Sequence, residues 1–211
     1  MPKKQQLVPH WLTWAREIQA LAQTGAAYAE NNWQTKRYDR LMEIASEISS
    51  TYSDVDDESI LRQFQNEHGY ATPKVDVRAA AFYEGKLLMV REISDNGWTL
   101  PGGWADVGDI PSEAAEREAW EESGYRVKAI KVIGVYDANR FEPIDFFHAY
   151  KLIFLCQIIG GKAQPSSETS EVAFFNQDEI PGNLSFSRTP ARVLADCFNA
   201  QADHSIAAIF D

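Results

Sequence analysis

Three carboxylates crowd one face of a short predicted helix in the middle of the chain. Glu118, Glu121 and Glu122 are spaced i, i+3 and i+4, so they fall within an arc of about 100° on the helix surface. Like charges at this spacing repel and destabilise an isolated helix. A bound cation would neutralise them, and oxygen-only ligands suit a hard ion such as Mg²⁺ or Mn²⁺. The spacing alone is more typical of a solvated acidic helix face.

The residues around the cluster predict where this helix begins and ends. Ser112, which follows Pro111, is a suitable N-cap, and Gly124 is a suitable glycine for the C-terminal end. Ala114 and Ala115 lie on the same arc as the acids. The sequence therefore predicts that the acidic face is small and open.

A glycine-rich turn precedes the acidic helix. The turn, residues 100–103, reads Leu-Pro-Gly-Gly, and its glycines allow the backbone to approach a ligand closely. Its carbonyl groups can add neutral ligands to the carboxylates. Within the helix, Arg117 precedes Glu121 by four residues and can pair with it or with Asp109.

The whole pattern resembles the signature of the Nudix hydrolase family, G-x5-E-x7-R-E-U-x-E-E-x-G-U, where U is apolar. The chain has Gly103, Asp109 and then Arg117 to Tyr125 at the same spacing. Asp109 replaces the first glutamate of the signature, and we expect this shorter carboxylate to support the arginine rather than bind metal. Tyr125 stands where an aliphatic residue is usual, and it can still pack. The resemblance covers roughly residues 73–185.

The resemblance implies a hydrolase that splits a nucleoside diphosphate linked to another group, X, into a nucleoside monophosphate and phospho-X. Carried onto this chain, it makes Glu118 and Glu122 the main metal ligands. Glu121 would bind an additional ion or its water, the carbonyl of Gly102 is a further backbone ligand, and Arg117 joins the catalytic set. The expected cofactor is Mg²⁺ or Mn²⁺, which neutralises the diphosphate and activates a water for attack on phosphorus.

The general base is expected on a later loop, as is often the case in this family. Residues 166–171 offer Glu168 and Glu171, and Glu121 of the signature is a third candidate. Glu171 enters the apolar run 172–175, which would hold it near the end of the sheet. Glu168 lies in a Ser/Thr-rich loop, and loops carry functional and merely solvated charges alike.

Several side chains are candidates for the substrate side of the site. The cations are Arg78, Arg91, Arg140, His148 and Lys151. Arg91 is the first choice because it ends a predicted strand just before the turn, and an arginine fork matches phosphate bidentately; a surface ion pair with Glu92 is the alternative. For His148, in a mostly apolar strand, a structural role is favoured. The aromatic candidates for stacking on a base are Trp98, Trp104 and Phe141, although aromatics in such folds more often belong to the core.

The chain divides into two predicted parts, a helical segment over residues 1–70 and a Nudix domain over residues 73–211. Apolar residues recur at helix spacing between residues 10 and 68, with expected breaks at Gly25 and at Asn31-Asn32 and a third short helix over 59–67. After residue 73, the patterns predict strands over 75–83, 86–92, 98–100, 127–137, 149–159 and 172–175, the acidic helix, and a terminal helix over 189–201. This order predicts an α/β fold, an α/β/α sandwich with a mixed sheet, which is also the fold that the Nudix resemblance implies.

The N-terminal helices resemble the accessory segment of a Nudix subgroup that acts on nucleoside diphosphates linked to a sugar or alcohol, such as ADP-ribose or CDP-choline. Short amphipathic helices cannot bury their apolar faces alone. We therefore expect a homodimer in which this segment forms part of the interface. An intramolecular flap is the alternative.

Composition limits the other functions. The 211-residue chain carries a formal net charge of −11, which gives no electrostatic route to a nucleic-acid backbone. Its two cysteines, Cys156 and Cys197, lie in predicted buried elements and are expected as free thiols. No apolar run is long enough to span a bilayer and no apolar signal segment opens the chain, so a cytoplasmic enzyme without membrane contact is expected.

Two other functions are alternatives to the diphosphate hydrolase. A nucleoside triphosphate pyrophosphohydrolase would use the same signature, but the N-terminal extension argues against it by analogy. A non-catalytic, Nudix-like nucleotide sensor would be expected to lose carboxylates of the signature, whereas Glu118, Glu121 and Glu122 are all present.

Overall fold

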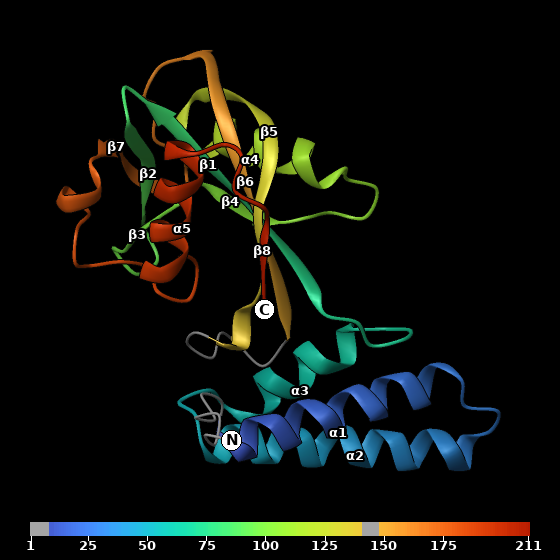
Figure 1. Ribbon diagram of the computed structural model, residues 1–211. Helices are drawn as coiled ribbons and strands as arrows, with labels where there is room; N and C mark the ends of the chain where they lie inside the picture. Colours follow the sequence, from blue (N-terminus) through green and yellow to red (C-terminus); the bar gives the residue numbers. More distant parts are fainter. Residues whose placement is uncertain (1–8, 141–147) are drawn as a thin grey trace, which may run out of the picture. The chain divides into compact units, whose positions relative to one another are not determined.

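The computed structural model describes residues 9–140 and 148–211 (Figure 1). Contacts within the chain divide these residues into two units. The first contains residues 9–73 and His148, and the second contains residues 74–140 and 149–211.

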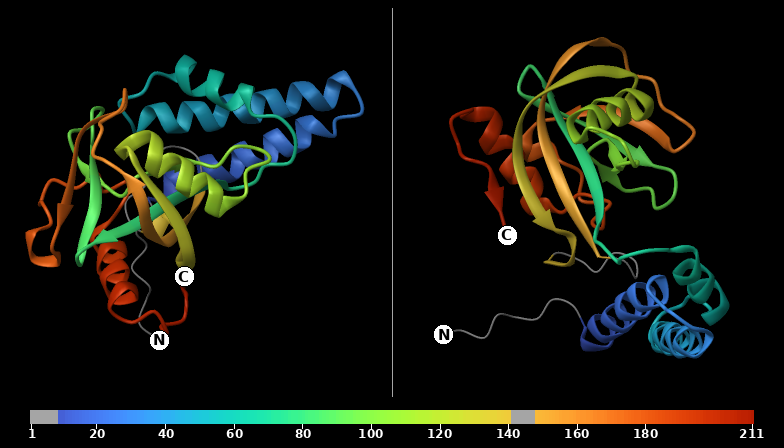
Figure 2. Two further views of the ribbon diagram at one scale, coloured as in Figure 1. Left: turned by 90° about the horizontal axis from the view of Figure 1, so that it is seen from above. Right: turned by 90° about the vertical axis from the view of Figure 1, so that its right-hand side faces the viewer.

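The N-terminal unit consists of three helices, α1 (His10–Ala27), α2 (Asn32–Thr51) and α3 (Asp57–Asn66). Helices α1 and α2 run side by side (Figure 2). The side chains of Asn31 and Asp56 cap α2 and α3. The unit has its own apolar core of Ala22, Met42, Ala45, Ile60 and Phe64.

The expected break at Gly25 is wrong, because α1 continues through it to Ala27. Its role lies in packing. A Cβ at Gly25 would come within 2.1 Å of the ring of Tyr38 on α2. Glycine at this position allows α1 and α2 to approach each other closely.

The second unit is built on one mixed sheet. Its strands are β1 (Lys74–Tyr83), β2 (Lys86–Glu92), β3 (Trp98–Thr99), β4 (Gly102–Trp104), β5 (Tyr125–Asp137), β6 (Ala149–Gly161), β7 (Thr169–Phe175) and β8 (Ile209–Phe210). The order is β3-β2-β1-β6-β5-β8, with β4 also paired to β1 and β7 to β2. The pairs β1–β6 and β5–β8 are parallel and the others antiparallel. The predicted mixed sheet is confirmed.

Helices cover both faces of this sheet (Figure 2), α4 (Pro111–Ser123) on one and α5 (Ala191–Ala202) on the other. Alternate residues of β1 divide between them: Val77 and Ala79 pack in the cluster that contains Ala115 of α4, whereas Ala80 packs in the cluster that contains Val193 of α5. This confirms the predicted α/β/α sandwich. Both cysteines are free and buried, as predicted.

Strand β1 changes its antiparallel partner along its length. Near its end it pairs with β2 through the predicted Glu84-Gly85 turn, where both turn residues have positive φ. Near its start it pairs instead with β4, so that Arg78 lies opposite Gly102. This change of partner places the glycine-rich turn against the sheet, next to α4.

Candidate active site

Helix α4 presents the three carboxylates and begins at Pro111, with Ile110 as its N-cap. The prediction of Ser112 as N-cap is therefore wrong by two residues, because the ring of Pro111 favours the first helical position. Gly124 ends the helix as predicted. Its φ is 76°, and its amide donates to the carbonyl of Trp120.

The alanines of α4 hold the helix against the sheet. Ala114, Ala115 and Ala119 are buried in the cluster that contains Val77 and Ala79 of β1. The sequence predicts an open face at these alanines, and this prediction is wrong because the sheet covers them. Their small side chains instead bring the helix close to the sheet and to the turn that precedes it.

Two of the carboxylates lie against the glycine-rich turn. The amide of Gly102 donates to Oε2 of Glu122 at 2.9 Å. A Cβ on Gly103 would lie 3.0 Å from Oε2 of Glu118, so Glu118 rests on the glycine backbone. Glu118 and Glu122, one helical turn apart, thus line the same space between α4 and residues 102–103.

Arg117 joins the remaining acids of the signature. Its Nη1 donates to Glu118 Oε1 at 2.7 Å and to Glu121 Oε2 at 3.3 Å, and its Nη2 donates to Asp109 Oδ2 at 3.1 Å. Asp109 also accepts a hydrogen bond from the amide of Asp106. The structure therefore contains both pairs considered for Arg117, and Asp109 contacts the arginine. The side chain of Glu121 is about half exposed.

Burial changes the protonation of the two inner carboxylates. It raises the pKa of Glu122 to about 7, although the Arg78 charge and the Gly102 amide oppose the rise. Burial likewise raises the pKa of Glu118, with Arg117 opposing. Such carboxylates are costly to ionise alone, and a cation bound between them would favour the charged forms.

The donor set of this space fits a hard divalent cation in chemical type. Glu118 and Glu122 supply oxygen ligands from one helix face, and the adjacent turn has backbone carbonyls. Among the described residues, no three His, Cys, Asp or Glu side chains are already gathered as a metal-binding group. Arg117 bonds to one oxygen of Glu118 and one oxygen of Glu121, so the second oxygen of each carboxylate can meet a cation while the arginine holds the first.

The later loop approaches α4 through Thr169. Thr169 Oγ1 donates to the carbonyl of Glu122 at 2.7 Å, and the amide of Gln164 donates to the carbonyl of Ser123 at 2.9 Å. Glu168 is exposed and directly precedes this contact. The loop that carries it is thus attached to the end of the acidic helix.

Glu171 and Arg91 form an ion pair on neighbouring strands. They lie opposite each other in β7 and β2, and Arg91 Nη1 is 2.5 Å from Glu171 Oε1. The ion-pair alternative for Arg91 thus occurs, but with Glu171 rather than Glu92. A candidate base and a candidate phosphate ligand therefore partner each other.

Two cations expected on the substrate side lie in the interior. Arg78 is 3% exposed and bonds to Asp76 and to the Leu100 carbonyl, and Lys151 is 1% exposed and bonds to Asp76. Mutual neutralisation with Asp76 makes the burial of these two cations tolerable.

The other substrate-side candidates lie on separate elements of the chain. Arg140 is exposed at the end of the short 3₁₀ turn that follows β5, and His148 directly precedes β6. Phe141 lies outside the described residues. Trp98 is buried in the core beneath α5 and makes an edge-to-face contact with Phe175, so it has a core role. Trp104, at the end of β4, is exposed.

Two charged residues near the site had no distinguishing sequence pattern. Glu92, at the end of β2, is buried, and Arg188 Nε lies 3.3 Å from its Oε1. Burial raises the pKa of Glu92, with the charge of Glu168 adding to the rise and those of Arg188 and Arg78 opposing it. The sequence pattern predicts only a surface ion pair with Arg91 for Glu92, and Arg188 lies in an irregular segment.

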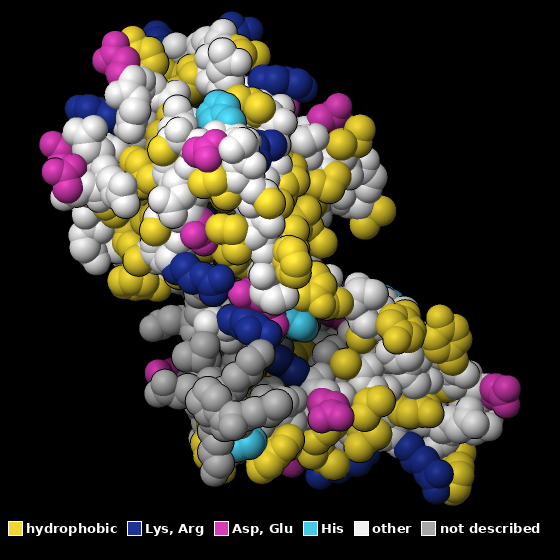
Figure 3. Space-filling model, viewed as in Figure 1, with side chains coloured by type: hydrophobic (Ala, Val, Ile, Leu, Met, Phe, Trp, Pro, Cys, Tyr) yellow, Lys and Arg dark blue, Asp and Glu magenta, His cyan; other side chains and the backbone are white. Residues whose placement is uncertain are grey.

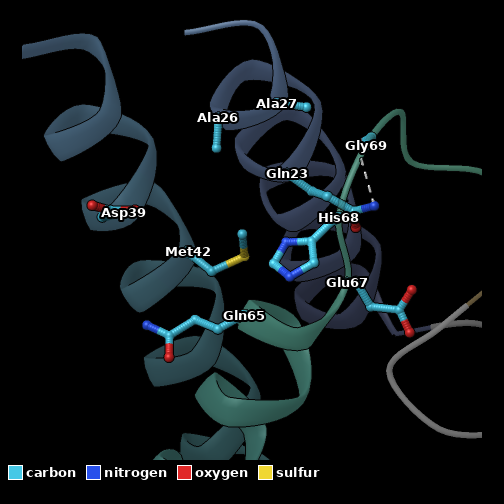
Figure 4. Close-up of a pocket in the computed structure, with 9 residues that line it drawn as sticks. All are labelled: Gln23, Ala26, Ala27, Asp39, Met42, Gln65, Glu67, His68 and Gly69. Atoms are coloured by element: carbon cyan, nitrogen blue, oxygen red, sulfur yellow. Dashed lines mark hydrogen bonds between the residues drawn. The ribbon is translucent and has the colours of Figure 1, made fainter. Parts of the chain in front are cut away.

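A cavity of about 210 Å³ lies in the N-terminal unit (Figure 4), where His68 and Met42 face each other. Its lining includes the acids Asp39 and Glu67 but neither lysine nor arginine. The carboxylates of the signature lie elsewhere, between α4 and the glycine-rich turn. That space is therefore the better candidate site.

Comparisons with known proteins cover most of the chain. Residues 9–64 match a family model described as a UDP-X-like, N-terminal oligomerisation domain, and residues 72–197 match the NUDIX domain. A Bacillus subtilis (strain 168) protein named "Putative ADP-ribose pyrophosphatase YjhB" is 37% identical over 184 residues, which are 87% of this chain and 88% of that protein.

Solved structures agree with these matches. The crystal structure of a UDP-X diphosphatase has a TM-score of 0.63 at 29% identity, covering 95% of this chain and 98% of that one. The structure of an ADP-ribose pyrophosphatase from Streptococcus suis 89-1591 has a TM-score of 0.61 at 38% identity, covering 66% of this chain and 100% of that one. In the described part of the chain, no helix combines the length and apolarity that a membrane span requires.

Proposed function

Since the chain belongs to the Nudix hydrolase family, we propose that it hydrolyses a nucleoside diphosphate linked to another group, X. The proposed substrates are of the ADP-ribose or UDP-X type. The products would be a nucleoside monophosphate and phospho-X. The observation that carries the proposal is the position of Glu118 and Glu122 against the Gly102-Gly103 backbone. This arrangement offers oxygen ligands beside a turn that a diphosphate can approach closely.

The proposed cofactor is Mg²⁺ or Mn²⁺, held by Glu118, Glu122 and the carbonyl of Gly102, with Glu121 available to a further ion or its water. When bound, such a cation neutralises phosphate oxygens and lowers the pKa of a water molecule. Arg117 would keep Glu118 and Glu121 oriented while it is itself held by Asp109. The protein's share of catalysis is then mainly positioning and charge neutralisation.

Among the three candidates for the base, we favour Glu168. Its neighbour Thr169 bonds to the carbonyl of Glu122, which ties this loop to the acidic helix, whereas Glu171 is engaged by Arg91. Glu168 would accept a proton from the attacking water. The water oxygen forms a bond to one phosphorus as the anhydride P–O bond breaks, and the leaving phosphate departs with the bridging oxygen.

The proposed assembly is a homodimer through the N-terminal unit. This unit matches a model described as an oligomerisation domain. Trp14 and Leu21 are exposed on α1, and Tyr28 is exposed at its C-cap. Their seven-residue spacing sets them along one side of the helix and its end. Figure 3 shows apolar side chains gathered over the helices of this unit. A second copy would cover such a stripe.

A substrate panel tests the proposed function. Purified protein would be incubated with Mg²⁺ or Mn²⁺ and ADP-ribose, several UDP-sugars, CDP-choline, dinucleoside polyphosphates or nucleoside triphosphates, and the products resolved by chromatography. We expect a nucleoside monophosphate from ADP-ribose or a UDP-sugar, and no product with EDTA or with Glu122→Gln. Glu113→Gln is the matched control, because Glu113 is exposed on the first turn of the same helix.

The other outcomes discriminate between the alternatives. Turnover confined to CDP-choline would keep the reaction type and change the substrate. Pyrophosphate release from triphosphates alone would make the protein a triphosphate pyrophosphohydrolase. Tight binding of one nucleotide with no turnover of any would make it a sensor.

A further inference from the structure

A group of buried charges lies beneath the glycine-rich turn. Asp76 and Arg78 on β1 are each 3% exposed, and Lys151 on β6 is 1% exposed. Arg78 Nε and Nη2 donate to the two oxygens of Asp76 at 2.7 and 3.0 Å, and Lys151 Nζ donates to Asp76 Oδ2 at 2.9 Å. The parallel register of β1 and β6 sets Asp76 directly opposite Lys151.

Such a group is costly to bury, so stability alone explains it poorly. Well-packed apolar residues often stabilise an interior as much as a buried ion pair does, or more. With two cations and one anion, the group also keeps an excess positive charge. That charge and the fixed geometry of the arginine guanidinium therefore indicate a local function.

The third bond of Arg78 leads to the turn. Its Nη1 donates to the carbonyl of Leu100 at 3.1 Å. Gly102 lies opposite Arg78 in the β1–β4 register, and a Cβ at Gly102 would be 2.8 Å from both Cα and Cδ of Arg78. The turn is thus hydrogen-bonded to the arginine at one residue and rests on it at another.

The same turn holds the inner carboxylate of α4. The Gly102 amide donates to Glu122, and the Arg78 and Glu122 charges attract each other. A continuous chain of contacts therefore runs from Asp76 through Arg78 and the turn to Glu122. Outer partners of this kind orient the groups that bind a metal.

We propose that Arg78, clamped by Asp76, is a positioning residue that sets the Leu100–Gly102 turn and thereby Glu122 and the Gly102 carbonyl for a divalent cation. It does not meet the substrate phosphates. This inference rests on the proposed metal site. On this inference, the buried guanidinium of Arg78 supports the metal ligands. Exposed cations elsewhere would contact the phosphates.

The test compares the Mn²⁺ affinity, kcat and KM of three folded variants with those of wild type. Arg78→Met should weaken Mn²⁺ binding about 10- to 100-fold, as loss of an outer partner typically does, with a fall in kcat and little change in KM at saturating Mn²⁺. Arg78→Lys keeps the positive charge but loses the forked guanidinium, so it should also weaken Mn²⁺ binding. If Arg78→Met does not fold, Arg78→Lys serves as the test. Lys151→Met removes a buried cation that has no bond to the turn, and it should lower the melting temperature while largely retaining Mn²⁺ affinity.

Two results overturn the inference. One is wild-type Mn²⁺ affinity in folded Arg78→Met and Arg78→Lys, which would make the residue purely structural. The other is a raised KM with unchanged Mn²⁺ affinity, which would return Arg78 to phosphate binding. Mn²⁺ binding by wild type that Glu122→Gln abolishes establishes the underlying site independently, and its absence removes the metal site and this inference together.

Discussion

The amide of Gly102 donates a hydrogen bond to Oε2 of Glu122 across 2.9 Å, and this contact joins the glycine-rich turn to the acidic helix. It uses a backbone donor, which every residue type except proline supplies. The carboxylate it holds is buried, so its position is fixed by the fold rather than by solvent. The proposed chemistry depends on this contact.

Replacing Glu122 with Gln should abolish most of the activity. The amide oxygen of glutamine can still accept from Gly102, but the negative charge that would hold a cation is gone. We expect kcat to fall about 100-fold or more, the size expected for loss of metal-based charge stabilisation. Steady-state kinetics and Mn²⁺ titration would measure the change, and Glu113→Gln should behave like wild type. Full activity in Glu122→Gln would exclude this carboxylate as a ligand.

Stability should depend on pH through Glu122. Its pKa is raised by burial from the ordinary 4.5 to about 7, so between these values the folded protein holds a proton that the unfolded chain has lost. The contribution of this group to stability is fully present below pH 4.5 and is lost as pH rises to 7, by about 3 kcal/mol. Mn²⁺ affinity should rise over the same interval, because binding requires the ionised form.

Urea unfolding of the metal-free protein from pH 5 to pH 8 would measure the loss. Glu122→Gln is the comparison, since it lacks the titrating group and should show a smaller decrease over this range. If the free energy of unfolding fell equally with pH in wild type and Glu122→Gln, the carboxyl group of Glu122 would titrate in the ordinary range.

The site could be anticipated from the sequence wherever its spacing is local. Glu118 and Glu122 follow helix periodicity, and Gly124 ends the helix as its type predicts. Strand β4 was not anticipated, because Gly102 and Gly103 have no side chains to show alternation. Its pairing with β1 is a tertiary feature.

The burial of Arg78 could not be anticipated for a different reason. Alternating charges at Asp76 and Arg78 are typical of a strand with one solvated face. The partner that helps to neutralise them, Lys151, lies 75 residues from Asp76 along the chain, and only the parallel pairing of β1 with β6 brings it near. Register between distant strands is not visible in a single sequence.

Gly102 should tolerate no side chain. Its φ is 147°, and a Cβ there would lie 2.1 Å from the carbonyl oxygen of Val77. Gly102→Ala must therefore displace the turn or β1, and we expect a loss of more than about 2 kcal/mol, the range for overpacking. Gly108→Ala is the control. Gly108 also has positive φ, but nothing lies within 4 Å of its Cβ position, so about 1 kcal/mol of backbone strain is expected. Thermal unfolding of both variants would compare them, and equal losses would contradict the packing argument.

Substitution of Glu168 and of Glu171 should have different effects on kcat. Glu168→Gln should lower kcat about 100- to 10,000-fold, the usual contribution of a general base, while Mn²⁺ affinity is retained. Glu171→Gln should have little effect on kcat, because its carboxylate already pairs with Arg91 at 2.5 Å. The pH profile of kcat/KM provides the second readout, since loss of the base should remove its acidic limb. A larger effect of Glu171→Gln would transfer the role to that residue.

The exposed stripe on α1 should control self-association. Leu21 is 62% exposed between Trp14 and Tyr28, and a charge at this position would be buried in a dimer that uses the stripe. Leu21→Glu should weaken the dimer at least about 100-fold, since burying one leucine in each copy contributes roughly 3 kcal/mol in total. Light scattering over a range of protein concentrations would measure the shift to monomer. Ile130→Glu is the matched control, because Ile130 is 51% exposed on β5 of the other unit. An unchanged dimer in Leu21→Glu, or a dimer lost equally in both variants, would place the interface elsewhere.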